Sequence, residues 1–285
     1  MSGKKIAVVT GGNKGIGYAI VRGLCKKYDG DVYLTARDEG RGMTAVAELK
    51  KEGLSPKFHQ LDVNNPASID KLRDFIKENY GGLDVLVNNA GMAYLPDLIQ
   101  NRHMVSDVPY LQQAEETCNT NFWGLLNVCN ALFPLLRSHA RVVNLSSMIC
   151  LMTLRQLRPD TKQRVLACKT VDDVKAFMTD FVESVRSNSH VEKGWPDRNA
   201  YGMSKVGVTA LSIIQQKDLD ADKSRQDIIV NSCCPGYVST DMTSHMGYKT
   251  VEQGADTPLY LALLPENVKT PRGAYVSERK IGRWE

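Results

Sequence analysis

The sequence predicts an α/β domain in which helices cover both faces of one doubly wound parallel sheet. Short apolar segments typical of buried strands alternate with segments of helical apolar spacing along the 285-residue chain. Polar residues that could bind a ligand or take part in catalysis follow several of these apolar segments directly. Because parallel strands bring their carboxyl ends to one edge of a sheet, these polar residues are expected to meet there.

Seven strands and five helices are expected in order. The first strand, 5–9, is apolar and β-branched, as in strands buried on both faces. Pro66 after Asn65 marks a helix start, because proline suits the first helical position. The other strands are predicted at 31–37, 57–61, 83–87, 141–145, 227–231 and 273–277. The helices are predicted at 18–25, 38–52, 66–79, 111–137 and 199–218, and there is no internal repeat.

Composition limits the class of protein. The apolar share of 42% is enough for a sizeable core, and one domain over 1–285 is expected. The net charge of +4 is scattered, without a basic block, so nucleic acid is not an expected partner. No apolar run reaches membrane-spanning length and no apolar signal segment opens the chain, so a cytoplasmic location is expected. Seven cysteines without metal-site spacing are interpreted as reduced thiols, and no metal is expected.

A glycine-rich turn joins the first strand to the first helix, and its spacing is Gly-x-x-x-Gly-x-Gly. Glycines permit a tight turn, and the helix N-terminus offers backbone N–H groups to a pyrophosphate. This context predicts a Rossmann-type dinucleotide site, although the spacing differs from Gly-x-Gly-x-x-Gly. A glycine turn without a ligand is the alternative. The residues predicted to bind cofactor are Gly11, Asn13, Lys14, Gly15, Ile16 and Gly17.

The end of the second strand indicates which dinucleotide binds. About 20 residues beyond the glycines, an acidic residue favours NAD, whereas an arginine suits the 2′-phosphate of NADP. Position 36 is alanine and position 37 is Arg37, whose guanidinium can bind phosphate through two hydrogen bonds. Lys14 and Arg41 are further candidates. Asp38 and Glu39 follow Arg37, so a solvated Arg37 is the alternative.

Tyr201 and Lys205 are the main candidates for proton transfer. Four residues apart, they lie on one face of the helix predicted at 199–218. An ammonium near a phenol favours the phenolate and lowers the phenol pKa. We therefore expect Tyr201 to exchange a proton with a substrate near neutral pH. Alone, this spacing often occurs by chance, and the nucleotide loop is what gives it weight.

Together these motifs resemble the short-chain dehydrogenase/reductase superfamily over nearly the whole chain, and within it the cytosolic monomeric carbonyl reductases. The stretches that carry the resemblance are Thr10 to Gly17, Tyr80 to Gly91, Asn121, Ser146-Ser147, Tyr201-x-x-x-Lys205, Cys233 to Gly236 and Tyr260 to Pro265. The resemblance implies NADPH as cofactor and a small-molecule carbonyl as substrate.

The resemblance also implies the catalytic roles. Tyr201 would protonate the carbonyl oxygen, and Lys205 would lower the Tyr201 pKa and hold the nicotinamide ribose. Ser147 would hydrogen-bond the carbonyl oxygen, with Ser146 as its rival. Asn121 would hold a water that links Lys205 to solvent, with Asn119 as its rival.

Further cofactor contacts are implied along the strand ends. Asp62 and Val63 would flank the adenine, although Asp62 is equally well explained as a helix cap. Asn88 is interpreted as a structural residue. The other implied cofactor-binding residues are Asn89, Gly91, Pro235, Gly236, Val238, Ser239 and Thr240.

Ser147 and Tyr201 are 54 positions apart, wider than is usual in the superfamily, because of an insertion at 151–196. Phe177, Met178 and Phe181 form an apolar helical stripe within it that needs burial. If this stripe covers the helices through which relatives pair, the protein is a monomer; the alternative is a dimer contact. The segment 92–111 is expected to border the substrate.

Ser147, Met148, Tyr237 and Met242 are the candidate substrate-binding residues. Four methionines, at 148, 152, 242 and 246, predict an adaptable apolar pocket, with core packing as the alternative. The expected activity is NADPH-dependent reduction of ketones, aldehydes or quinones. A reductase dedicated to one steroid, prostanoid or pteridine and a non-enzymatic NADP(H) sensor are the alternatives.

Cys234 directly precedes Pro235 and lies beside the expected site. In the carbonyl reductases that the chain resembles, a cysteine at this position lies near a glutathione-binding region, so glutathione or its conjugates are candidate partners. A buried, inert thiol is the alternative. Cys233 is expected to face the opposite side of the strand.

Overall fold

The computed structural model describes residues 3–94 and 107–284, and within them one sheet forms in the order β3-β2-β1-β4-β5-β6-β7-β8. The first seven strands pair in parallel, which confirms the predicted α/β class. The strands are β1 (Ile6–Val9), β2 (Asp31–Ala36), β3 (Lys57–Gln60), β4 (Leu83–Asn88), β5 (Leu136–Leu145), β6 (Ile229–Cys234), β7 (Tyr275–Ser277) and β8 (Lys280–Ile281).

The eighth strand was not expected from the sequence. It pairs antiparallel with β7 through a tight hairpin whose central residues, Glu278 and Arg279, both have positive φ angles, 51° and 59°. Such turns usually contain Asn or Gly, because those residues adopt positive φ at little cost. Neither Glu278 nor Arg279 is of this type, so the turn could not be predicted from its residues. The ion pair of Arg279 with Asp256 and that of Glu278 with Lys249 hold the turn to the neighbouring segment.

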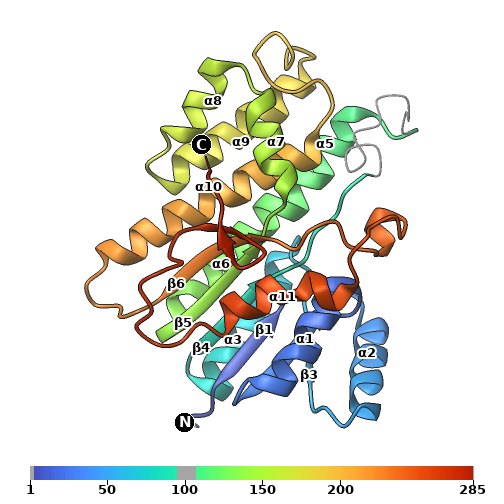
Figure 1. Ribbon diagram of the computed structural model, residues 1–285, viewed down its shortest axis with the longest axis vertical. Helices are drawn as coiled ribbons and strands as arrows, with labels where there is room; N and C mark the ends of the chain where they lie inside the picture. Colours follow the sequence, from blue (N-terminus) through green and yellow to red (C-terminus); the bar gives the residue numbers. More distant parts are fainter. Residues whose placement is uncertain (1–2, 95–106, 285) are drawn as a thin grey trace.

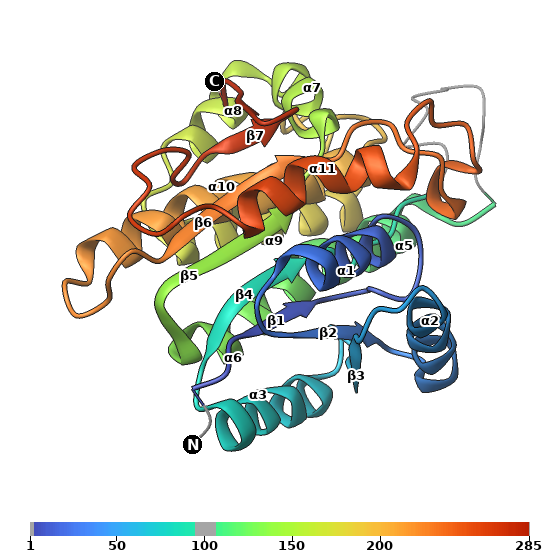
Figure 2. The ribbon, with the colours of Figure 1, turned by 60° about the horizontal axis from the view of Figure 1, so that its bottom comes forward.

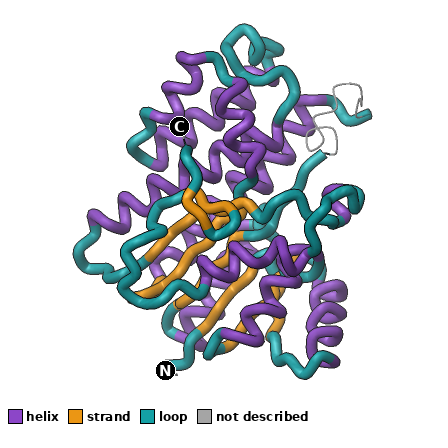
Figure 3. Tube along the Cα trace, viewed as in Figure 1, coloured by secondary structure: helices purple, strands orange, loops and turns teal. Residues whose placement is uncertain are grey.

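Helices cover both faces of the sheet (Figure 3). They are α1 (Gly15–Lys27), α2 (Glu39–Lys51), α3 (Pro66–Tyr80), α5 (Tyr110–Cys118), α6 (Leu125–Leu132), α7 (Met148–Gln156), α8 (Pro159–Leu166), α9 (Val171–Arg186), α10 (Ala200–Ala221) and α11 (Val251–Ala262). The prediction of one continuous helix at 111–137 was wrong. A π-helical turn at Asn119–Gly124 separates α5 from α6, and a 3₁₀ turn at Phe133–Leu135 leads into β5.

The buried residues of β1 show why both faces need cover. Ile6 and Val8 belong to the apolar cluster that includes α3 and α6 on one face, while Ala7 and Val9 belong to the cluster that includes α1, α2 and α11 on the other. All four are inaccessible to solvent. Figure 2 shows α1 and α11 side by side in front of the sheet, where they pack against each other. The continuous apolar run at 6–9 therefore indicates a strand that is buried on both faces.

The insertion forms α7, α8 and α9, which gather at one end of the molecule beside α10 and α5 (Figure 1). Helix α9 packs against both α5 and α10. Phe177 and Phe181 contact the Trp195 ring, with centroids 4.8 and 5.6 Å apart, and Met178 is fully buried. A Cβ at Gly207 in α10 would lie 2.7 Å from Met178 Sδ, so glycine permits the close packing. The expected apolar stripe is confirmed as a packed surface.

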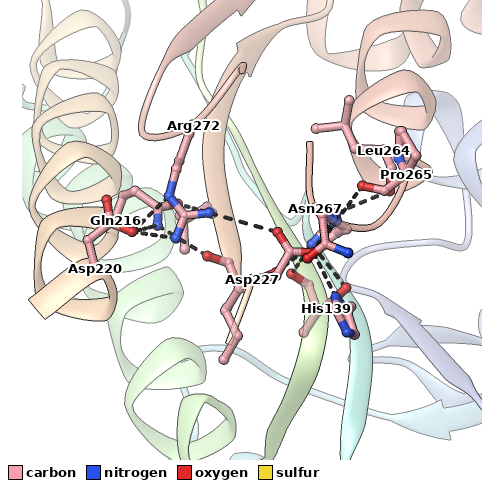
Figure 4. Close-up of polar contacts among 12 residues, drawn as sticks. His139, Gln216, Asp220, Asp227, Leu264, Pro265, Asn267 and Arg272 are labelled. Atoms are coloured by element: carbon pink, nitrogen blue, oxygen red, sulfur yellow. Dashed lines mark hydrogen bonds and ion pairs between the residues drawn. The ribbon is translucent and has the colours of Figure 1, made fainter. Parts of the chain in front are cut away.

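The amino edge of the sheet is held by a buried arginine. The Arg141 guanidinium donates to the carbonyl oxygens of Leu264 (3.1 Å) and Pro265 (2.5 Å), and to Asp227 Oδ2 (3.0 Å). The same carboxylate oxygen accepts from His139 Nδ1 (2.8 Å) and Asn267 N (2.7 Å), as Figure 4 shows. Burial raises the Asp227 pKa, but these hydrogen bonds outweigh burial and hold that pKa below its usual value.

Arg141→Met is expected to destabilise the fold by about 3 kcal/mol, because it removes the nearer cation of the buried Asp227 carboxylate and leaves only Arg272, at 4.0 Å. Arg73→Met, which removes an exposed ion pair on α3, is the matched control and should change stability little. Urea unfolding followed by circular dichroism measures both. Equal effects of the two substitutions would contradict the importance of the buried pair.

Candidate active site

The polar residues predicted from the sequence lie along the carboxyl edge of the sheet. Gly11, Arg37 and Asp62 follow β1, β2 and β3, and Ser147 and Pro235 follow β5 and β6. Because these strands are parallel, their carboxyl ends share one edge. Asn88 ends β4, so Asn89 lies on the same edge.

The glycine loop has the geometry that an anion site requires. Gly11 and Gly15 have φ angles of 63° and 57°, which disfavour other residues. A Cβ at Gly17 would overlap Asn89 Nδ2 and the Gly11 carbonyl oxygen. Helix α1 has no side-chain cap and no acidic residue in its first turn, whereas Asp38, Asn65 and other cap residues serve later helices. The first amides of α1 are therefore not capped by a side chain.

Asn89 shapes this loop. Its side-chain Nδ2 donates to the carbonyl oxygens of Thr10 and Gly11, both at 2.9 Å, and its backbone N–H donates to Thr10 Oγ1 at 2.9 Å. These bonds join the end of β4 to the turn after β1. Asn88 is buried and donates to Asn144 Oδ1 at 2.8 Å, in keeping with a structural interpretation.

Three basic side chains lie near the first two strand ends. Lys14 Nζ forms an ion pair at 2.7 Å with Asp241, across from the glycine loop. In the part of the chain that the structure describes, no ion pair engages Arg37 or Arg41. Asp38 accepts from the Arg41 backbone N–H as the cap of α2, so this carboxylate has a structural role of its own. The Arg37 guanidinium is exposed and available to an anion.

Asp62 and Val63 follow β3. Asp62 Oδ1 accepts from Asn64 N at 2.9 Å, while Asn65 is the residue that caps α3. The alternative that Asp62 caps this helix is therefore wrong. Val63 is buried, and a Cβ at Gly124 would lie 3.0 Å from its Cγ2.

Ser147 and Tyr201 meet although they are far apart in sequence. Ser147 caps α7 by accepting from Ile149 N at 3.2 Å, and its side chain also hydrogen-bonds Tyr201 in the first turn of α10. Ser146 faces the other way, because its hydroxyl contacts Thr209 Oγ1 at 2.7 Å and the Lys205 carbonyl oxygen at 3.2 Å. The structure therefore brings the second serine, and not the first, to Tyr201.

The Lys205 ammonium lies over the face of the Tyr201 ring. Its Nζ donates to the Leu145 carbonyl oxygen at 2.8 Å and lies 5.6 Å from the centroid of the Tyr201 ring. Burial lowers the Lys205 pKa to about 8. Burial also raises the Tyr201 pKa, and the Ser147 hydrogen bond only opposes that effect. The expectation of a lowered Tyr201 pKa is not met, because desolvation dominates and the ammonium lies over the ring.

Asn121 lies in the π-helical turn, buried, whereas its rival Asn119 is exposed. Its amide donates to the Met92 carbonyl oxygen (2.8 Å) and to Ser204 Oγ (3.0 Å), and its carbonyl accepts from Met92 N (2.8 Å). A Cβ at Gly91 would lie 3.1 Å from Asn121 Oδ1 and 3.7 Å from Lys205 Nζ. Gly91 thus lies between Asn121 and Lys205.

The segment after β6 approaches the glycine loop. Gly236 has a φ of 89°, and Val238 forms a parallel bridge with Lys249. Ser239 N donates to the Lys249 carbonyl oxygen at 2.9 Å, so the segment folds back on itself. A Cβ at Gly15 would lie 3.4 Å from Thr240 Cγ2. With the Lys14–Asp241 pair, this places residues 238–241 against the start of α1.

Large apolar side chains are exposed around the same edge. The interpretation of the four methionines as core residues was wrong, since all are at least one-third exposed: Met148, Met152, Met242 and Met246. Tyr237 packs edge-on against Tyr248, which is 76% exposed.

Cys233 and Cys234 face opposite sides of β6, as expected. Cys233 packs with α1 and α11, and Cys234 packs with the helices of the insertion. Cys234 Sγ accepts from Met148 N at 3.1 Å and from Gly236 N at 3.3 Å. It is nevertheless buried, with 3% of its surface exposed.

Two residues near the site were missed from the sequence. Asp241 pairs with Lys14, and Asn199 caps the helix that carries Tyr201. The position of Asn199 at the start of the helix predicted at 199–218 was a usable signal for the cap. Nothing local indicated the partner of Asp241, because Lys14 lies 227 positions away.

Comparison with known proteins decides the family. The model of the short chain dehydrogenase family matches residues 5–159 and 182–250. This chain belongs to the short chain dehydrogenase family. The unmatched residues, 160–181, contain most of α8 and α9, so the middle of the insertion predicted at 151–196 lies outside the match, whereas its two ends are matched.

Named members of the family resemble the chain over its full length. Carbonyl reductase (NADPH) 1 of Mus musculus is 48% identical and covers 99% of both chains. Carbonyl reductase (NADPH) 3 of Rattus norvegicus is 48% identical over 98% of both chains. Among solved structures, salutaridine reductase from Papaver somniferum is 30% identical, with a TM-score of 0.84 over 95% of this chain and 99% of its own.

Two features are absent from the described residues, 3–94 and 107–284. No cluster of three or more His, Cys, Asp or Glu side chains there is arranged to hold a metal ion. None of the helices in that part of the chain has the length and apolar character needed to cross a membrane.

Proposed function

We propose that this chain reduces carbonyl compounds to alcohols with NADPH and that Tyr201 is the proton donor. The observation that carries the proposal is the meeting of Ser147, Tyr201 and Lys205 beside a glycine loop that is open to an anion. The names of the full-length relatives, carbonyl reductase (NADPH), support both the reaction and the cofactor.

The residues present fit the cofactor. The uncapped first turn of α1 suits a pyrophosphate, and Arg37 and Lys14 supply cations for the 2′-phosphate. Asp62 and Val63 would flank the adenine, and Asn89 and Gly91 would border the dinucleotide along β4. Pro235, Gly236, Val238, Ser239 and Thr240 would contact the nicotinamide end, with Ile16 and Asn13 at the glycine loop. When bound, NADPH supplies a hydride to the carbonyl carbon.

The chain's own residues complete the reaction. Ser147 donates a hydrogen bond to the carbonyl oxygen, which gains negative charge as the carbon is reduced. Tyr201 then transfers its phenolic proton to that oxygen, so the product is an alcohol and the tyrosine is left as a phenolate. Lys205 stabilises the phenolate through its positive charge, and Asn121 holds the water through which a solvent proton restores Tyr201. A raised Tyr201 pKa suits this direction, because the donor must be protonated at neutral pH.

Tyr201→Phe is expected to lower single-turnover hydride transfer by about 10²–10⁴-fold, because it removes the proton and keeps the ring. NADPH binding, measured by cofactor fluorescence, should be nearly unchanged. Tyr260→Phe in α11 is the matched control and should retain full activity. Retention of most activity by Tyr201→Phe would remove the proton donor from the proposal.

The buried lysine predicts the pH dependence. Burial lowers the Lys205 pKa to about 8, so the charge that would hold the nicotinamide ribose and stabilise the phenolate is lost as pH rises through that value. At saturating carbonyl, kcat/KM for NADPH should therefore fall above about pH 8, since this ratio reports groups of the free enzyme. The raised Tyr201 pKa puts its own titration at higher pH. A flat profile between pH 7 and 10 would contradict the assignment.

Arg37→Ala is expected to weaken the binding of NADPH by about 1.5–3 kcal/mol, because a charge-assisted contact is lost. The binding of NADH should be weakened far less. Equilibrium binding of both cofactors, followed by fluorescence, measures the difference. Arg73→Ala on α3 serves as the control for removal of a positive charge. If Arg37→Ala affects both cofactors equally, Arg37 does not bind the 2′-phosphate.

The exposed side chains support a broad range of carbonyl substrates. Ser147, Met148, Tyr237 and Met242 would contact the substrate, and flexible thioethers adapt to ligands of different shape. A reductase with one physiological substrate is the alternative, and a panel of ketones, aldehydes and quinones distinguishes the two. Most of the segment 92–111, which we expected to border the substrate, lies outside the described residues. A sensor without catalysis is disfavoured, because sensing requires only the nucleotide loop.

Three further statements remain predictions. The arrangement of one sheet with shared core supports a single domain over 1–285. The cytoplasmic location rests on the sequence alone. A role for Cys234 in binding glutathione is supported by its two backbone donors, but its burial favours the alternative of an inert thiol.

We propose that the protein is a monomer. Helix α9 covers α5 and α10, the helices through which short-chain reductases commonly pair, and its stripe residues are buried. Light scattering at micromolar concentration should therefore give the mass of one chain. A stable dimer or tetramer would show that another surface mediates pairing.

A further inference from the structure

Three helices position the proposed catalytic residues, and all three are hydrogen-bonded to one buried residue, Asn199. Helix α7 begins after Ser147, α10 carries Tyr201 and Lys205, and α5 leads into the turn with Asn121. Helix α10 packs against both α7 and α5 (Figure 1). Asn199, the residue directly before α10, is 4% exposed and contacts all three helices.

Asn199 uses separate atoms for each contact. Its Oδ1 accepts from Gly202 N at 2.9 Å and caps α10. Its Nδ2 donates to Thr153 Oγ1 at 2.8 Å and to Gln156 Oε1 at 3.3 Å, both on α7. Its backbone N–H donates to the Tyr110 hydroxyl at 3.0 Å, at the first residue of α5. A cap alone needs only the first of these contacts.

The packing around this contact is close. Thr153 has no solvent exposure, and a Cβ at Gly202 would overlap both Thr153 Oγ1 and the Asn199 side chain. A second link joins the start of α10 to the Asn121 turn, where Asn121 Nδ2 donates to Ser204 Oγ and Ser204 Oγ donates to the Tyr201 carbonyl oxygen. The first turn of α10 is therefore fixed relative to both α7 and the Asn121 turn.

We propose that Asn199 and Thr153 are positioning residues that set the distance between the Ser147 and Tyr201 hydroxyls. The inference rests on the proposed function, since it concerns the geometry of that proton transfer. Ser147 is six residues before Thr153, and Tyr201 is two residues after Asn199, so the Asn199–Thr153 bond lies within two turns of both hydroxyls. Displacement by about 1 Å at a reacting centre is enough to lower rates strongly.

A double-mutant cycle tests the proposal. Asn199→Ser keeps a capping oxygen but loses the donor to Thr153, and Thr153→Val loses the acceptor at similar shape. Each is expected to lower single-turnover hydride transfer by about tenfold while NADPH affinity stays unchanged. The double variant should be no slower than the slower single variant, because removing both partners leaves no unpaired buried group.

Asn231→Ser is the matched control. Asn231 lies in β6 and is similarly buried; its Nδ2 donates to the Pro271 carbonyl oxygen, and its Oδ1 accepts from Ala274 N just before β7. It should lower the free energy of unfolding without slowing hydride transfer. If Asn199→Ser slows transfer no more than Asn231→Ser, or if the two single effects add independently, the proposal is overturned.

Two further measurements decide the test if Asn199→Ser does not fold or if the proposed function itself is wrong. Should Asn199→Ser fail to fold, Thr153→Val alone decides, since it leaves the cap of α10 intact, and a wild-type transfer rate in it overturns the proposal. Tyr201→Phe separates this inference from the proposed function. An inactive Tyr201→Phe with fully active Asn199→Ser and Thr153→Val rejects only the positioning role, whereas an active Tyr201→Phe rejects the proton donor itself.

Discussion

Parallel pairing of β1 to β7 is the constraint on which the rest of the structure depends. Because each of these strands runs in the same direction, the chain must return through a helix after almost every strand, and both faces of the sheet become buried. The same constraint puts every strand's carboxyl end at one edge. Residues as distant as Gly11 and Pro235 are thereby brought to the same side of the sheet before any side-chain contact is made.

Much of this arrangement was predictable from the sequence, and the failures have physical causes. The apolar runs of β1 and β4 and the motifs at Gly11 and Tyr201 are local signals, and the structure places them as expected. The π-helical turn at Asn119–Gly124 keeps the apolar pattern of a helix, so periodicity could not reveal it. The Glu278–Arg279 turn was hidden because neither residue favours positive φ on its own.

The electrostatics of the site depend on burial more than on spacing. The Tyr-x-x-x-Lys pattern places the two side chains together, but the sequence does not reveal how far water is excluded from them. Exclusion of water raises the pKa of the Tyr201 phenol and lowers the pKa of the Lys205 ammonium, so both groups shift toward their neutral forms. Likewise, the sequence identified Asn199 as a helix start but could not show that Thr153, 46 positions earlier, lies against it.

Arg141 has a consequence for how the protein can diverge. Its guanidinium binds backbone carbonyls at 264 and 265, so it constrains the course of that loop and leaves most of the loop's side chains free to vary. At the opposite edge, exposed side chains such as Met148, Met242 and Tyr248 take no part in the Arg141 contacts, so their replacement should not disturb this anchor. One edge of the sheet is thus held by backbone contacts, while exposed side chains at the other edge can change the ligands that fit there without altering the fold.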